Sequence, residues 1–413
     1  MGKIWQKKTH EEIKKIIFGA LDKNVDYVNQ NVLGIPASYL DDKVFNQDAS
    51  FLKNSPFIST LVNNPNHIGC HTLGKSEPFF NGTQAIEREV IEMCAVDILK
   101  GESGKHDGYI ASGGTESNMQ AVWIFRNLFM QKHGAKRDEI AILCSEDSHY
   151  SFDKAANILA VGIQKVKVDI ESRKISEATV LEALDTAREK GYKCFIVVCN
   201  MMTTMFGSVD NIDHYISAFG KTGLDHKIHV DGAYGGFYYP FTENEGKLTF
   251  ENQHITSFTL DAHKMAQAPY GTGIFLIRKD YIQYANTSQA SYVEGEDFTM
   301  IGSRSGANAI AVWMILMKNG PFGWQEKVFI LQKRTRWMCA QLKELGIEFY
   351  GHPKSNIITI KSSSIDTSIA AEFGLVPDNH SDPKWYKIVI MDHVTIEKLI
   401  PLVEKIKQSK NLA

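Results

Sequence analysis

A lysine that could do covalent chemistry stands in the sequence Asp-Ala-His-Lys at residues 261–264. It follows a short apolar segment and precedes a loop rich in proline and glycine, residues 269–273. The amine of a lysine can capture a carbonyl group as a Schiff base. A lysine at the end of a strand is more often a solvated charge, so a chemical role for Lys264 depends on partners elsewhere in the chain.

A second group, Gly113, Gly114 and Thr115, lies between a polar turn and a predicted helix. Glycines let main-chain amides face an anion, a helix N-terminus adds a favourable dipole, and the threonine hydroxyl adds a donor. The pattern favours a phosphate site, although two glycines before a capping residue also begin many ordinary helices. The P-loop signature GxxxxGK[ST] is absent from the sequence, which excludes a nucleotide triphosphatase of that kind.

A third group could surround a pyridine ring. The sequence His-Val-Asp at 229–231 ends an apolar strand in a carboxylate, and Asp231 would keep a ring nitrogen protonated, although it could equally cap the next turn. Ala233 is small enough to lie flat against a ring, and His149 could stack on the opposite face or be an ordinary loop histidine. With Lys264 and the phosphate pattern, these residues indicate pyridoxal 5'-phosphate.

Four segments in this order resemble the group II pyridoxal-phosphate-dependent amino-acid decarboxylases of fold type I, the aspartate aminotransferase fold. They are ASGGTESN (111–118), SHYSFDKA (148–155), HVDGAYGG (229–236) and SFTLDAHKM (257–265). The resemblance extends from about residue 55 to residue 320, and the segments are specific as an ordered set. It implies a homodimer with the active site at the interface between the two subunits.

The resemblance also implies a role for each site residue. Lys264 would hold the cofactor as a Schiff base, and Asp231 would pair with the ring nitrogen. His263, Gly114 and Thr115 would contact the phosphate. His149 and Ala233 would lie on the two faces of the ring, and Thr203 and Thr204 would lie near the ring hydroxyl. Met202 stands where the family usually has glycine, which puts the contacts of Thr203 and Thr204 in doubt.

Residues 291–297 and the Gly-Ser-Arg turn at 302–304 resemble the mobile catalytic loop and the matching turn of the bacterial histidine decarboxylase branch. The resemblance implies that Tyr292 protonates Cα after carbon dioxide leaves, while a loop tyrosine without chemistry is the alternative. Arg304 either holds a loop or binds a carboxylate.

The implied activity is α-decarboxylation of an L-amino acid, with histidine as the first expectation. Residues 63–84 depart from the histidine branch, so aspartate, glutamate and aromatic amino acids stay open. A carbon–carbon lyase of the sphingosine-phosphate lyase type shares the same motifs and is a second hypothesis. A catalytically silent binding protein of this fold is a third, against which the retention of Lys264, Asp231 and His149 argues.

The loop 63–72 carries His67, Cys70 and His71, which are possible metal ligands. Adjacent ligands in a His-x2-Cys-His pattern fit one tetrahedral centre poorly. We therefore expect no metal and interpret the segment as a structural or substrate-facing loop.

The elements that must position these residues follow from the hydrophobic pattern between about 105 and 280. Short apolar segments alternate there with amphipathic ones, which predicts a mainly parallel sheet with helices on both faces. The predicted strands are 141–144, 166–168, 194–199, 228–230, 257–260 and 274–278, and the predicted helices are 115–130, 152–160, 177–190 and 212–219. Ligands bind at the carboxyl ends of such strands, where His149, Thr204, Asp231 and Lys264 lie.

Three regions are predicted: an N-terminal arm (1–55), a large cofactor-binding domain (56–300) and a smaller α/β C-terminal domain (301–413). The arm contains a helix near 10–21, and a helix over 83–100 has Thr83 as its expected N-cap. The C-terminal domain is expected to contain helices 308–318 and 325–345, strands 357–360 and 386–391, and a last helix from 395 that Pro401 kinks or delays.

Composition limits the partners. The 413 residues include 45 Lys and Arg against 48 Asp and Glu, a net charge of −3, so no positive field recruits nucleic acid or an anionic membrane. The N-terminus has no apolar signal region, and the longest nearly apolar segment, 194–202, is too short to span a bilayer. Six cysteines without a CxxC pair indicate reduced thiols and a cytoplasmic enzyme.

Overall fold

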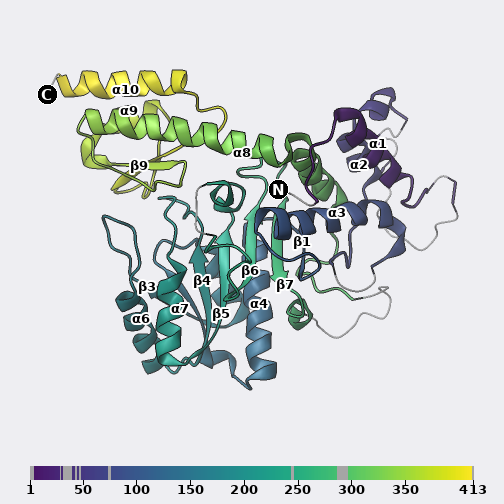
Figure 1. The fold of residues 1–413 in the computed structure, drawn as a ribbon, viewed down its shortest axis with the longest axis horizontal. Helices are drawn as coiled ribbons and strands as arrows, with labels where there is room; N and C mark the ends of the chain where they lie inside the picture. The colour runs from purple at the N-terminus through teal and green to yellow at the C-terminus, as the bar shows by residue number, and fades with distance from the viewer. Residues whose placement is uncertain are drawn as a thin grey trace.

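The computed structural model describes residues 4–27, 29–30, 40–41, 44–45, 48–72, 76–242, 246–285 and 296–411. A seven-stranded sheet in the order β1-β7-β6-β5-β4-β2-β3 forms its centre (Figure 1). Its strands are β1 (His106–Ala111), β2 (Ile140–Ser145), β3 (Gly162–Val166), β4 (Cys194–Asn200), β5 (Asp225–Gly232), β6 (Ile255–Asp261) and β7 (Gly273–Arg278).

The strands β3, β2, β4, β5 and β6 are parallel neighbours, and only β7 runs antiparallel to both of its partners, β6 and β1. The predicted mainly parallel sheet is confirmed. Such sheets are buried on both faces, so their strands read as continuous apolar segments. In β4, for example, every residue is buried, with Phe195 and Val197 in the core on one face and Ile196 and Val198 in the core on the other.

Helices cover both faces of this sheet. The helices α4 (Gly114–Lys132) and α5 (Ser151–Leu159) pack on one face, and α6 (Glu177–Glu189) and α7 (Ile212–Thr222) pack on the other. All four were predicted within a few residues. Strand β3 begins and ends earlier than expected, at 162–166 instead of 166–168, and β1 was not predicted because it opens with the polar residues His106 and Asp107, which pairing with β7 buries.

The N-terminal part contains α1 (His10–Leu21), as predicted, α2 (Pro56–Asn63) and α3 (Asn81–Met93), which continues in a π-helical turn, Cys94–Ile98. The prediction that Thr83 caps α3 was wrong. The helix begins at Asn81, and the side chain of Asn24 accepts hydrogen bonds from the main-chain amides of Gly82 and Thr83. The cap comes from a distant segment, which leaves Thr83 buried inside the first turn.

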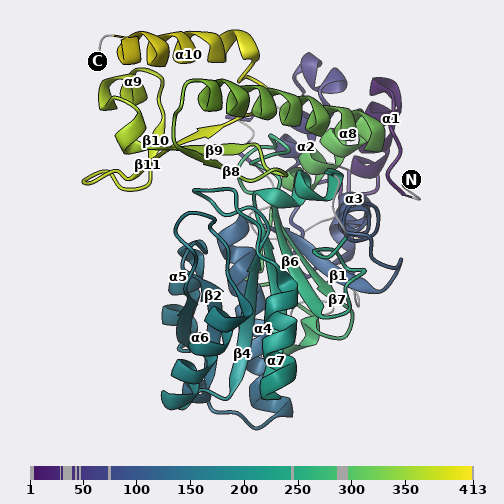
Figure 2. The same cartoon turned by 60° about the vertical axis from the view of Figure 1, so that its left-hand side comes forward.

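The C-terminal part is a four-stranded antiparallel sheet with helices. It contains β8 (Phe349–Gly351), β9 (Ile357–Lys361), β10 (Val376–Pro377), β11 (Trp385–Val389), α9 (Thr367–Glu372) and α10 (Ile396–Asn411). Helix α8 (Gly306–Glu344) joins the two predicted helices across a break at Gly320, whose φ is +66°. Figure 2 shows α8 crossing from the N-terminal helices to the small sheet, with α10 along it. Pro401 lies inside α10 and does not delay its start.

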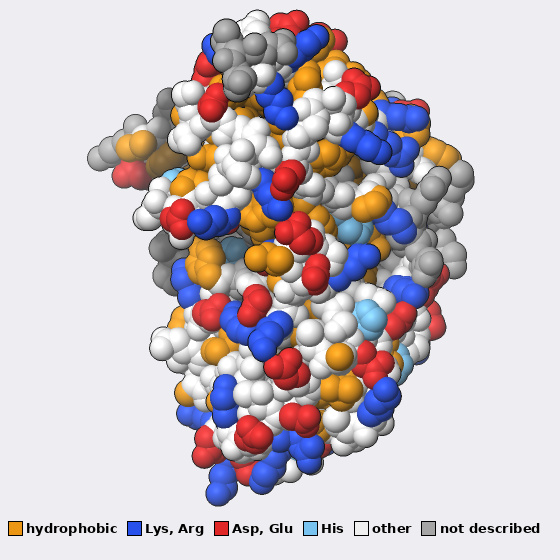
Figure 3. Space-filling model, turned by 90° about the vertical axis from the view of Figure 1, so that its left-hand side faces the viewer, with side chains coloured by type: hydrophobic (Ala, Val, Ile, Leu, Met, Phe, Trp, Pro, Cys, Tyr) orange, Lys and Arg blue, Asp and Glu red, His pale blue; other side chains and the backbone are white. Residues whose placement is uncertain are grey.

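Short 3-10 turns connect these elements at Ser50–Asn54, Pro78–Phe80, Arg137–Glu139, Gly235–Phe237, Tyr239–Phe241, Ile282–Ala285 and Ser362–Ser364. Within the described ranges no helix has the length and apolar character needed to cross a membrane. On the face drawn in Figure 3, basic and acidic side chains are interspersed. The division into regions at residues 55 and 300 stays a prediction.

Candidate active site

The predicted site residues meet at the carboxyl ends of the parallel strands. His149 follows β2, Thr204 follows β4, Asp231 lies at the end of β5, and Lys264 follows β6. These four strands are neighbours in the sheet, so residues far apart in the sequence face one cavity. This is the location that parallel α/β topology favours for a ligand.

The cavity has two adjoining parts. One, of about 320 Å³, is lined by residues from the start of α4 and from the loop after β6, and the other reaches toward the end of β4. His149, Ala233 and Lys264 line both parts, so they form one continuous site. The structure thus brings together the described residues predicted for the cofactor: Gly114, Thr115, His149, Thr204, Asp231, Ala233, His263 and Lys264. Tyr292 lies outside the described residues.

Lys264 is held by a carboxylate that sequence reasoning did not single out. Its Nζ lies 3.2 Å from Oδ2 of Asp261, the last residue of β6, and the main-chain amide of Gly114 donates to the same oxygen at 3.2 Å. Asp261 is buried, while about a third of the Lys264 side chain is exposed. Asp261 therefore connects the side chain of Lys264 to the main chain of Gly114. The sequence feature that could have indicated this role is the position of a carboxylate three residues before the lysine.

The start of α4 has the shape of an anion site. A Cβ on Gly114 would lie 3.0 Å from Asp261 Oδ2, and a Cβ on Gly273 would lie 2.5 Å from the main chain of Gly113. The first turn of α4 lines the cavity, and its main-chain amides, apart from that of Gly114 which donates to Asp261, form a helix N-terminus suited to an anion. The Glu116 carboxylate accepts a hydrogen bond from the amide of Ser112 at 2.7 Å, which holds the preceding turn.

His263 lines the same part of the cavity. Its Nδ1 lies 2.8 Å from Asp261 Oδ1 at an angle that forms no hydrogen bond, and within the described part of the chain this buried nitrogen has no other partner. Buried polar atoms without partners are uncommon, and an acceptor such as a phosphate oxygen would satisfy this one. The donor set of amides, the Thr115 hydroxyl and the His263 nitrogen therefore fits the phosphate of pyridoxal phosphate.

Asp231 is buried and makes two hydrogen bonds. Its Oδ1 accepts from the amide of Ala233 at 3.1 Å, and its Oδ2 accepts from the Asn118 side chain at 3.0 Å. Asp231 therefore caps this turn, as the alternative interpretation has it, and it also lines the cavity, while its role at a ring nitrogen stays a prediction. Asn118 was not predicted, although it lies one turn beyond Gly114 on α4.

His149 presents an uncharged ring to the cavity. Burial lowers its pKa, and the nearby Asp231 only partly opposes that shift. Its Nδ1 accepts a hydrogen bond from the amide of Ser151 at 3.2 Å, which fixes the ring at the start of α5. Tyr150 packs beside it, with ring centres 4.2 Å apart.

In the turn after β4, Thr203 and Thr204 do not both offer a free hydroxyl to the cavity. The Thr203 hydroxyl bonds to Ser208 Oγ at 2.7 Å, so it is engaged within its own loop. Met202 adopts a φ of +69°, a left-handed conformation that glycine adopts without strain. Lys387 of β11 reaches this turn from the small sheet and donates to the main-chain carbonyl of Thr204 at 3.0 Å. Nothing in the local sequence around Lys387 indicated this contact.

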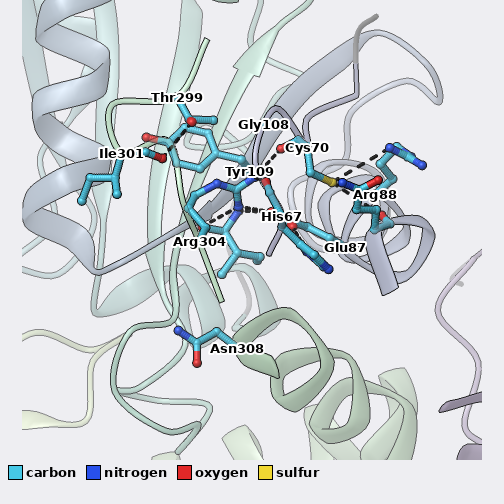
Figure 4. A network of polar contacts seen from close by, with 12 residues as sticks. His67, Cys70, Glu87, Arg88, Gly108, Tyr109, Thr299, Ile301, Arg304 and Asn308 are labelled. Atoms are coloured by element: carbon cyan, nitrogen blue, oxygen red, sulfur yellow. Dashed lines mark hydrogen bonds and ion pairs between the residues drawn. The ribbon is translucent and has the colours of Figure 1, made fainter. Parts of the chain in front are cut away.

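Arg304 holds a loop. Its guanidinium is buried, forms an ion pair with Glu87, and donates to the main-chain carbonyls of Ile110, His67 and Cys70 (Figure 4). These bonds use all four terminal N–H groups, so of the two roles left open by the sequence the structure supports the structural one. The arginine connects the loop 67–70 to β1, directly before the phosphate pattern.

The possible metal ligands of that loop are already engaged. His67, Cys70 and Glu87 are buried with ligand atoms within 4.8 Å of one another. However, the two ring nitrogens of His67 contact Glu87 and Thr83, and the Glu87 carboxylate is paired with Arg304. Burial also raises the pKa of the Cys70 thiol, which disfavours the thiolate that a metal requires. The absence of a metal stays a prediction, and this geometry supports it.

Comparisons with known proteins show which sequences and structures this chain resembles. Residues 82–351 match the family model described as the pyridoxal-dependent decarboxylase conserved domain. The chain is 48% identical over 407 residues to the tryptophan decarboxylase of Clostridium sporogenes (strain ATCC 15579), with 98% of each chain covered. It is 28% identical over 394 residues to a probable L-tyrosine/L-aspartate decarboxylase of Methanosarcina barkeri (strain Fusaro / DSM 804), covering 90% of this chain and 96% of the other.

Among solved structures, the L-methionine decarboxylase of Streptomyces sp. 590 superposes with a TM-score of 0.70 at 20% identity. The superposition covers 83% of this chain and 86% of that one. At that identity the likeness concerns the fold, which is therefore the predicted fold type I.

Proposed function

Because the chain belongs to the pyridoxal-dependent decarboxylases, we propose that it removes the α-carboxylate of an aromatic L-amino acid. Its cofactor is pyridoxal 5'-phosphate, and its substrate is an amino acid. Tryptophan is the first choice, with tryptamine and carbon dioxide as products. The observation that carries this choice is the 48% identity to a tryptophan decarboxylase over nearly the whole of both chains. The first expectation, histidine, has no support from these relatives.

The residues in the cavity suit this reaction. Lys264 would hold the cofactor through its amine, and the α4 amides, Thr115 and His263 would hold the phosphate. His149 and Ala233, which line both parts of the cavity, would enclose the ring. When bound, pyridoxal phosphate supplies an electron sink for the pair of electrons left on Cα when the carboxylate departs.

The chain's own groups would control protons and charge. Asp231 would hold a proton at the ring nitrogen, because a buried carboxylate stabilises a positive charge next to it. Asp261 would orient the Lys264 amine, which lies 3.2 Å from it. The proton that replaces the carboxylate on Cα would come from Tyr292, a role that rests on the sequence resemblance alone. A homodimer with the site at the subunit interface rests on the same resemblance.

A substrate panel tests the proposal. Purified holoenzyme is incubated with L-tryptophan, L-tyrosine, L-phenylalanine, L-histidine, L-aspartate and L-glutamate, and carbon dioxide and amine are both measured. We expect the highest kcat/KM with tryptophan and equal amounts of carbon dioxide and tryptamine. A preference for histidine or an acidic amino acid would refute the substrate choice. Release of an aldehyde would indicate a carbon–carbon lyase, and no product from a cofactor-loaded protein would indicate a silent one.

A further inference from the structure

A buried chain of hydrogen bonds ends on Asp231. Residues 229 and 231 of β5 lie on the same face of the sheet because side chains alternate along a strand. Ser257 of β6 lies opposite His229 in the register, and Thr259 lies opposite Asp231. Helix α4 covers this face, and Asn118 on α4 contacts both His229 and Asp231. Of these residues only Asp231 was assigned a role in the reaction.

The distances define three consecutive hydrogen bonds. Ser257 Oγ lies 2.7 Å from His229 Nδ1. His229 Nε2 lies 3.0 Å from Asn118 Oδ1 and 3.2 Å from Thr259 Oγ1. Asn118 Nδ2 donates to Asp231 Oδ2 at 3.0 Å and also to Ser151 Oγ at 2.9 Å. Ser257, His229 and Asn118 are at most 1% exposed, so water does not compete for these bonds.

The direction of each bond follows from the chemistry of the groups. An ionised carboxylate only accepts hydrogen bonds, so the amide nitrogen of Asn118 must face Asp231 and its carbonyl oxygen must face His229. Burial lowers the pKa of His229 to about 3, so the ring is neutral and carries one N–H. We place that hydrogen on Nε2, because the Asn118 oxygen facing this nitrogen cannot donate, while the Thr259 hydroxyl beside it can accept. The Ser257 hydroxyl then donates to Nδ1.

We propose that Ser257, His229 and Asn118 are positioning residues that act through Asp231, stabilising its negative charge so that it can hold the proton on the cofactor's ring nitrogen. The proposal rests on the role given to Asp231 in the proposed function. All three donors point toward the carboxylate. In a buried site, aligned hydrogen bonds polarise one another and strengthen the last bond of the series.

A graded set of variants tests the relay. Asn118→Leu removes the bond to Asp231, His229→Phe removes the second bond, and Ser257→Ala removes the third. The matched control is Thr256→Val, which removes a hydroxyl from the buried neighbour of Ser257, at the point where the register between β5 and β6 shifts. Each protein is loaded with pyridoxal phosphate labelled with ¹⁵N in the ring, and the ¹⁵N chemical shift is followed with pH. The dissociation constant of the cofactor is measured in parallel.

We expect the ring nitrogen to lose its proton most readily in Asn118→Leu, less so in His229→Phe and least in Ser257→Ala. The dissociation constant should rise by at least about 10-fold for Asn118→Leu, because it loses a hydrogen bond to a charged group, and by a few-fold for Ser257→Ala. Thr256→Val should match the unaltered protein. If Asn118→Leu does not fold, the test uses Ser257→Ala, which loses only one hydroxyl, and its ring-nitrogen shift is compared with that of Thr256→Val.

An unchanged ring-nitrogen shift in the folded variants would overturn the relay, as would an equal change in Thr256→Val. These measurements need no substrate. A protein that does not decarboxylate tryptophan but shows the graded shift would contradict the proposed substrate and leave the relay intact, whereas the reverse result would contradict the relay alone.

Discussion

Lys387 of the small sheet donates a hydrogen bond to the main-chain carbonyl of Thr204, 3.0 Å away in the turn that lines the cavity. Burial lowers the pKa of Lys387, and the nearby charge of Lys264 lowers it further. The small sheet therefore reaches the site with a cation close to the lysine that would hold the cofactor. The contact fixes a turn that carries both Thr204 and the strained Met202.

Replacement of this cation should impair the reaction more than the fold. In Lys387→Met the turn after β4 loses its hydrogen bond to the small sheet. We expect kcat/KM to fall about 5-fold, because one hydrogen bond contributes about 1 kcal/mol, which corresponds to a change of about 5-fold. The melting temperature should change little, since a partly desolvated charge is removed together with the bond. Steady-state kinetics and a thermal melt measure the two effects. Lys384→Met, which alters an exposed lysine of the same segment, is the control and should affect neither.

Met202 should show the cost of its backbone conformation. Its φ is +69° and its side chain is buried, so a direct change to glycine would mix lost packing with relieved strain. Comparison of Met202→Ala with Met202→Gly reports mainly on the backbone, because both lose every side-chain contact beyond Cβ. We expect the glycine variant to be more stable by about 1 kcal/mol in urea unfolding. At buried Met201, whose φ is not positive, alanine should be the more stable of the pair, and the same order at both positions would contradict the assignment of strain.

The location of the site could be predicted from the sequence, but its internal contacts could not. Lys264, Asp231 and His149 each follow an apolar strand, and parallel topology places such residues at one edge of the sheet. Asn118, Lys387 and the pairing of Arg304 with Glu87 depend on which distant segments become neighbours, which local periodicity does not encode.

The same limit explains the errors in the fold. Thr83 resembled an N-cap, but Asn24 supplies the cap from another segment. Strand β1 begins with His106 and Asp107, which are polar, and it is a strand because β7 pairs with it along its whole length. In both cases a tertiary contact overrides the local pattern.

Buried histidines should make the fold sensitive to mild acid. Burial lowers the pKa of His229 to about 3 and that of His106 to about 4. In the unfolded chain each binds a proton near pH 6.5, so the unfolded state takes up more protons and stability falls as the pH drops below about 6.5. We expect each histidine to contribute up to about 1.4 kcal/mol per pH unit between that pH and its folded pKa. Urea unfolding between pH 7.5 and 4.5 measures the slope.

The control for this pH dependence is His106→Gln, which keeps a side chain that can hydrogen-bond to the Glu102 carbonyl but does not titrate. In this variant the slope of the unfolding free energy against pH should be smaller by the contribution of His106, up to about 1.4 kcal/mol per pH unit. A slope that is the same in this variant as in the unaltered protein would show that other groups govern the acid response.

The ion pair of Arg304 and Glu87 should be essential for stability and dispensable for substrate recognition. Although burial opposes its ionisation, Arg304 and His67 lower the pKa of Glu87 to about 2, so the carboxylate is charged at neutral pH. Arg304→Met leaves this buried charge without its arginine, beside His67 and the Ile110 amide, and we expect a loss of about 3–5 kcal/mol in urea unfolding. Arg188→Met, which breaks an exposed pair with Asp185, should change stability little.

Arg304→Met also tests substrate recognition at a temperature where it is still folded. The KM for the amino acid should stay within about 2-fold of the unaltered protein, because loss of a hydrogen bond to the substrate carboxylate would raise KM by more than 2-fold. A rise in KM beyond about 10-fold without loss of stability would instead make Arg304 a substrate-binding residue.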